Sequence, residues 1–72
     1  MKNVRAAIVL HMLFALQEKG SFTEKETIDG LDISRSTFFR ALSDFRCYLM
    51  EHRSWESLEF NSEKNNYYLV RN

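Results

Sequence analysis

The spacing of the apolar residues changes once along this chain of 72 residues, and that change limits the folds open to it. Up to about residue 51 the apolar residues recur with a helical period, whereas from Trp55 onward they alternate with polar residues as in a strand. The clearest helical stripe consists of Phe38, Leu42, Phe45 and Leu49. We therefore expect a mainly α-helical chain with a small β-hairpin at its C-terminal end.

The predicted elements form a single domain over residues 1–72, because a chain of this length has no room for a second core. Three helices, at about 3–19, 24–30 and 34–51, precede a hairpin at about 57–70 with a polar turn. Only a few residues separate the second and third helices, as in a helix-turn-helix. With the hairpin, the predicted fold is a winged helix-turn-helix of three helices and a two- or three-stranded wing.

Several residues carry signals for the ends of these helices. Gly20 and Gly30 are expected to end the first and second helices, because glycine is the common residue after a helix. Thr23 and Glu26 have the spacing of a capping box at the start of the second helix. Ser34 is a good N-cap for the third helix.

The first predicted helix is apolar in nearly every direction around its axis. From Ala6 to Leu16 the apolar run is interrupted only by His11. A helix of a small domain needs one apolar stripe for its own core, so a second apolar face needs a partner, which is either another copy of the chain or a further domain. We therefore expect a homodimer, with an interface formed by Val4, Ile8, Met12 and Leu16. The alternative is a loosely patterned helix that leaves a few alanines and a methionine exposed.

Two segments resemble a known family. The helix-turn-helix of DeoR-type and WYL-type bacterial transcriptional regulators is similar to the segment Ile33-Ser34-Arg35-Ser36-Thr37-Phe38-Phe39-Arg40-Ala41-Leu42 with Asp44-Phe45-Arg46. The Gly-Tyr-Tyr-Leu-like run that closes their winged helix is similar to Asn66-Tyr67-Tyr68-Leu69. Ala41 stands where the family often has Asp, and Asn66 where Gly is common. The resemblance covers about residues 22–70 and implies a DNA-binding domain of a transcriptional regulator.

In a helix-turn-helix the second helix of the unit enters the major groove of double-stranded DNA with its N-terminal residues at the base edges. Arginine can bind guanine or phosphate, and hydroxyl side chains suit either partner. The residues expected to contact DNA are Ser34, Arg35, Ser36, Thr37, Phe39, Arg40, Ser43 and Arg46, with Lys64 from the hairpin turn. Instead of contacting DNA, Phe39 could form a dimer contact or pack on the first helix. The alternative for the arginines is that they lie on a solvated helix face, with Arg40 paired to Asp44.

The zero net charge is the main argument against a nucleic-acid partner, since a basic excess is the usual signature. The charges are unevenly distributed, however. Residues 35–53 carry four arginines and two acids, whereas residues 18–32 carry five acids and two lysines. We expect weak non-specific DNA binding with a shallow salt dependence, and a dimer that raises the affinity. The second hypothesis is a winged helix that binds protein and not DNA.

No residue pattern in the sequence indicates an enzyme, a cofactor or a metal site. His11, His52 and Cys47 lack the spacing of metal ligands, and no glycine-rich phosphate loop is present. The single cysteine excludes an intrachain disulfide, and the apolar run is shorter than the roughly 20 residues that cross a bilayer. We therefore expect a cytoplasmic protein with no membrane partner. Trp55 is expected to anchor the hairpin against the third helix.

Overall fold

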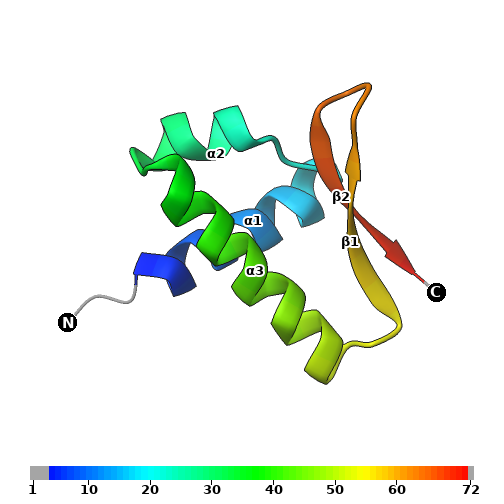
Figure 1. Ribbon diagram of the computed structural model, residues 1–72. Helices are drawn as coiled ribbons and strands as arrows, with labels where there is room; N and C mark the ends of the chain where they lie inside the picture. Colours follow the sequence, from blue (N-terminus) through cyan, green and yellow to red (C-terminus); the bar gives the residue numbers. More distant parts are fainter. Residues whose placement is uncertain (1–3, 72) are drawn as a thin grey trace.

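The computed structural model describes residues 4–71 and contains three helices followed by a two-stranded antiparallel hairpin (Figure 1). The elements are α1 (Val4–Lys19), α2 (Glu24–Leu31), α3 (Arg35–His52), β1 (Glu56–Asn61) and β2 (Asn66–Arg71). This architecture confirms the predicted mainly helical fold with a winged-helix layout. The predicted bounds differ from these by one residue, and the expected start of the first helix at Asn3 lies outside the described residues.

Two of the four predicted helix-end signals, Gly20 and Ser34, are confirmed. The capping box is confirmed in part, because the Glu26 carboxylate accepts from the Thr23 hydroxyl at 3.1 Å and not from the Thr23 amide. The Thr23 hydroxyl accepts a hydrogen bond from the Glu26 amide at 3.0 Å, and the Ser34 hydroxyl accepts one from the Thr37 amide at 3.1 Å. Gly20 has a φ of 83°, and its amide donates to the Leu16 carbonyl at 2.9 Å. These bonds satisfy backbone groups that a helix end otherwise leaves without partners.

The prediction that Gly30 ends the second helix is wrong. The helix continues to Leu31, and Asp32 takes the left-handed conformation with a φ of 52° while its amide bonds the Ile28 carbonyl. Aspartate is one of the few non-glycine residues that visit this conformation readily. The extra residue lets Leu31 pack against the core, which explains why the helix does not stop at the glycine.

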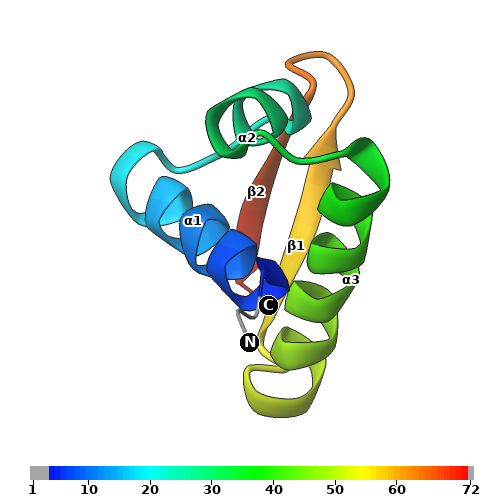
Figure 2. The same ribbon diagram turned by 90° about the vertical axis from the view of Figure 1, so that its left-hand side faces the viewer.

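The core lies between α1, α3 and the hairpin, with the two helices on either side of the strands in Figure 2. The predicted stripe of α3 is confirmed, since all four of its residues are buried. Phe22, in the connection between α1 and α2, forms a bridge to Tyr67 through two backbone hydrogen bonds of 3.0 and 2.8 Å. Its ring also stacks on that of Tyr67, so the connection extends the hairpin by one short pairing.

The predicted dimer stripe is wrong for three of its four residues. Ile8, Met12 and Leu16 are only 1%, 0% and 8% exposed, because they pack against the chain's own core. The large apolar residues of α1 that do face outward are Val4, Leu10 and Phe14, each about half exposed. A helix that is apolar all round gives no sequence signal for which face turns inward, and the positions of α3 and the hairpin decide it.

Trp55 does not anchor the hairpin as expected. Its side chain is half exposed, and the Arg53 guanidinium lies over its ring at 5.1 Å from the centroid. Leu58 and Tyr67, from the two strands, pack into the core instead. No helix within residues 4–71 has both the length and the apolar character that crossing a bilayer requires.

Candidate nucleic-acid interface

The first turn of α3 is held by its own hydroxyl groups. The Ser34 hydroxyl lies 2.8 Å from the Thr37 hydroxyl and 3.3 Å from the Ser36 hydroxyl, in addition to capping the helix. Ser34 and Ser36 are exposed, whereas Thr37 is half-buried. The three hydroxyl residues predicted to contact DNA at this end of the helix therefore lie together. Ser34 and Thr37 shape the first turn, and Ser36 lies at its surface.

The outward face of α3 lies opposite its buried stripe. At 100° per residue, this face contains Ser36, Arg40, Ser43 and Cys47, and all four are exposed. Together they place a guanidinium, two hydroxyls and a thiol along about three turns of one helix face. These groups can bond to phosphate or to base edges.

Arg40 has no hydrogen-bond or ion-pair partner among residues 4–71. The alternative in which Arg40 pairs with Asp44 is wrong, because Asp44 forms its ion pair with Arg5 instead, with 3.2 Å between the Arg5 Nε and the Asp44 Oδ2. Arg5 thus compensates Asp44, one of the two acids of α3 near this face; the other, exposed Glu51, lies four positions after Cys47 at the C-terminal end of the helix. A cation without a partner on an outward helix face remains available to an anion at no cost in intramolecular bonds.

Arg35 is already engaged by the chain. Its Nε lies 2.9 Å from the Glu24 Oε2, and its guanidinium lies 5.6 Å from the centroid of the Phe39 ring. Arg35 is 74% exposed, so a phosphate can still reach it, but Glu24 compensates its charge. Its contribution to anion binding is therefore expected to be smaller than that of Arg40.

Arg46 links α3 to the hairpin. Its Nη2 donates to the Leu58 carbonyl of β1 at 3.2 Å, and its guanidinium lies over the Tyr67 ring at 5.9 Å. These contacts fix the position of the hairpin relative to α3. Arg46 is expected to contact DNA, but its guanidinium already holds the hairpin against α3. The residues next to Arg46 in the sequence give no sign of this second role.

Phe39 lies outside the core. It is 39% exposed, and its ring contacts Phe38 edge-on at a centroid distance of 5.1 Å. The alternative that Phe39 packs into the core on the first helix is therefore wrong. Its exposed part lies beside Arg35 on the flank of the outward face.

Lys64 lies in the turn of the hairpin, which is level with the start of α3 but on the other side of α2 in Figure 1. The Asn61 Oδ1 accepts from the Glu63 and Lys64 amides at 2.9 and 3.2 Å, and Asn65 takes the left-handed conformation that such a turn favours. The Lys64 side chain is exposed, next to exposed Glu63. The wing therefore adds little net positive charge to this end of the molecule.

A cluster of charges that the sequence does not reveal lies at the opposite end of the hairpin. Glu56 lies between Arg53 at 2.5 Å and Arg71 at 3.6 Å, and its side chain is only 8% exposed. The Arg53 hydrogen bond holds the pKa of the Glu56 carboxyl below its ordinary value, partly opposed by burial. Predicting the pairing register of the two strands would have revealed this cluster, because Glu56 lies opposite Arg71 in the hairpin.

Glu56→Gln is expected to lower the melting temperature by a few degrees at pH 7, because it removes the charge that holds both arginines. The folded-state pKa of Glu56 is depressed, so its contribution is complete above the ordinary pKa of 4.5 and is lost as the pH falls through the folded value. Thermal unfolding at pH 7 and pH 3 should therefore show a difference between variant and wild type that shrinks in acid. Exposed Glu59 supplies the control, since Glu59→Gln should change little at either pH. A difference at Glu56 that does not depend on pH would contradict this assignment.

Comparison of the chain with known protein families, with curated proteins and with solved structures finds no significant match in any of the three. Among the described residues, no three histidine, cysteine, aspartate or glutamate side chains come together in a way that could hold a metal ion.

Proposed function

We propose that this chain binds double-stranded DNA in a sequence-specific manner through the outward face of α3 and acts as a transcriptional regulator. The observation that carries the proposal is Arg40, an exposed arginine without an intramolecular partner among residues 4–71, on the outward face of the second helix of a helix-turn-helix. In that position an arginine can bind a guanine edge or a phosphate in the major groove.

Three further features support DNA as the partner. Ser36 and Ser43 flank Arg40 on the same face and offer hydroxyls to phosphate or bases. The positive end of the α3 dipole lies near Ser34, where it favours an anion. The resemblance of residues 22–70 to the DNA-binding domains of DeoR-type and WYL-type regulators agrees with this assignment.

The proposal includes a homodimer formed through the outward side of α1, with Leu10 and Phe14 in place of the buried residues first predicted. These two residues are four apart, so they lie on one helix face, and they are 53% and 56% exposed. A dimer would bind two half-sites about one helical turn apart, and the second contact would compensate for the low net charge of one chain.

Phe14→Glu is expected to convert the dimer into a monomer, because it places a charge in the middle of this apolar face. The fold should be unaffected, since Phe14 is more than half exposed. Sedimentation at tens of micromolar, where a modest interface still holds, measures the effect. Met50→Glu, at a 73% exposed methionine of α3, introduces the same charge on another surface and should leave the dimer intact. A wild-type monomer under these conditions, or equal dissociation by both variants, would contradict the dimer.

The test of DNA binding is a titration of labelled duplexes from a random pool at low and moderate salt, followed by fluorescence anisotropy. We expect saturable binding at low salt and a shallow salt dependence, since few phosphates would be neutralised. Absence of binding to any duplex pool by the folded protein would refute the proposal.

A protein–protein interaction module is the second candidate. It is favoured by the acidic α2, which carries Glu24, Glu26 and Asp29, and by the exposed Leu10 and Phe14. Capture of a protein partner by a chain that binds no duplex would select this function over DNA binding.

A further inference from the structure

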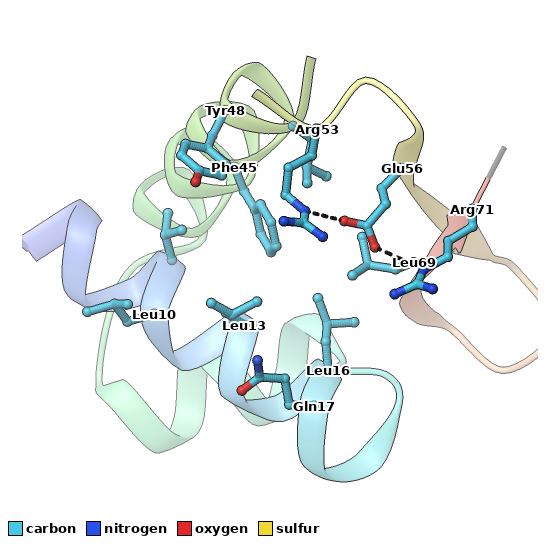
Figure 3. Close-up of a pocket in the computed structure, with 12 residues that line it drawn as sticks. Leu10, Leu13, Leu16, Gln17, Phe45, Tyr48, Arg53, Glu56, Leu69 and Arg71 are labelled. Carbon is cyan, nitrogen blue, oxygen red and sulfur yellow. Dashed lines mark hydrogen bonds and ion pairs between the residues drawn. The ribbon is translucent and has the colours of Figure 1, made fainter. Parts of the chain in front are cut away.

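A groove of about 600 Å³ lies between α1, the C-terminal half of α3 and the hairpin, and the proposed DNA contact does not use it (Figure 3). Its floor is apolar and is formed by Val9, Leu13, Leu16, Phe45, Leu49 and Leu69. The volume falls within the roughly 300–1,000 Å³ that is common for small-molecule sites. An apolar floor of this size favours a ligand with a hydrocarbon part.

The mouth of the groove carries the cluster of Arg53, Glu56 and Arg71. Figure 3 shows both guanidinium groups beside Glu56, on the side of the groove that faces Leu13 and Leu16 of α1. Two positive charges meet one carboxylate here, so the cluster carries a surplus of one positive charge next to an apolar floor. That combination is complementary to a monoanion with an apolar tail.

Arg71 is the arginine of this cluster that can turn to a ligand. Its Nε lies 3.6 Å from the Glu56 Oε2, and its side chain is 80% exposed. Arg53 satisfies Glu56 through a closer contact of 2.5 Å and also packs over the Trp55 ring. Glu56 therefore keeps a full partner when Arg71 moves, and the exchange loses only a long ion pair whose arginine is exposed.

We propose that this groove binds a small amphipathic carboxylate, with its tail against Leu13, Leu16 and Leu69 and its carboxylate on the Arg71 guanidinium. A cationic head group would meet two arginines, and a neutral one would leave the surplus charge without a partner. All the groups that form the site come from one chain. The proposal therefore does not depend on DNA binding, but Leu10 lines this groove as well as the proposed dimer interface, so ligand and dimer would meet at that residue.

The test is a titration with octanoate, 1-octanol and octylammonium, which share a tail and differ in the head group. Trp55 is the single tryptophan, and its ring touches the Arg53 guanidinium, so its fluorescence reports on the mouth of the groove. Amide chemical shifts of the labelled protein locate the bound ligand. We expect octanoate to bind at least about tenfold more tightly than either analogue, with shifts at the lining residues.

Two variants separate the head contact from the tail contact. Arg71→Gln should weaken octanoate about tenfold and leave octanol within about twofold, because only the charged contact is lost. Gln17→Phe places a large ring at an exposed edge of the groove and should weaken both ligands. Lys25→Gln removes an equal charge from α2, away from the groove, and should change neither. Equal affinity for octanoate and octanol, a preference that survives Arg71→Gln, shifts outside the groove or no binding of any ligand would each overturn the proposal.

Discussion

Replacing Phe38 with alanine is expected to lower the free energy of unfolding by about 3–5 kcal/mol, as is typical for a buried phenylalanine. Phe38 is 0% exposed, and its ring contacts Phe22 at 6.4 Å and Tyr67 at 6.0 Å between centroids. It therefore joins α3 to the connection after α1 and to β2. A domain of this size has a total stability of only about 4–11 kcal/mol, so the variant loses a large part of it.

Thermal unfolding followed by circular dichroism measures this loss. We expect the melting temperature of Phe38→Ala to fall by about 12 °C or more, since 1 kcal/mol corresponds to at least about 4 °C in a domain of this size. Phe39→Ala is a matched control, because it removes the same ring from the next position, which is 39% exposed. Its cost should be about 1 kcal/mol. Equal destabilisation by the two variants would contradict the described packing of α3.

Replacing Arg40 with alanine is expected to weaken binding to a specific duplex about tenfold or more, corresponding to roughly 1–3 kcal/mol for one base or phosphate contact. Stability should change by less than about 0.5 kcal/mol, because Arg40 is exposed and has no partner among residues 4–71. Arg35→Ala should have a smaller effect on DNA binding, since Glu24 already compensates that charge. Anisotropy titrations at fixed salt compare the variants.

Two further substitutions distinguish a specific contact of Arg40 from general electrostatic attraction. Arg40→Lys keeps the charge but loses the planar pair of donors, so it should retain non-specific binding and lose much of the specific preference. Lys19→Ala removes one charge at the C-terminal end of α1, on the side of the molecule away from α3 in Figure 2, and should leave DNA binding unchanged. If Lys19→Ala weakened binding as much as Arg40→Ala, general attraction and not a contact at α3 would account for the effect.

The parts of the fold that could be predicted are those with a strong local signal. The stripe of α3 repeats over several turns, so its buried residues, including Phe38 and Leu49, could be assigned from the spacing alone. The caps at Thr23 and Ser34 need only residues three positions further on, so they were equally visible. The change to alternating apolar and polar residues after Trp55 likewise predicted where the hairpin begins.

The parts that could not be predicted depend on contacts between distant residues. Arg46 was assigned to DNA because of its place on α3, but its bond to the Leu58 carbonyl depends on where the hairpin lies. The alternative interpretation paired Arg40 with Asp44, but Asp44 forms its ion pair with Arg5 from another helix. A local pattern can place a charge on a helix face, but the tertiary arrangement decides whether that charge is already paired.

Selection of bound duplexes from a random pool tests sequence-specific binding through α3, because it measures whether the chain discriminates between sequences. We expect enrichment of a motif with two half-sites about one helical turn apart. When Arg40→Ala is used in the same selection, the most constrained positions of that motif should be lost. Recovery of no enriched sequence by the folded wild-type protein, or of the same motif by Arg40→Ala, would contradict sequence-specific binding through α3.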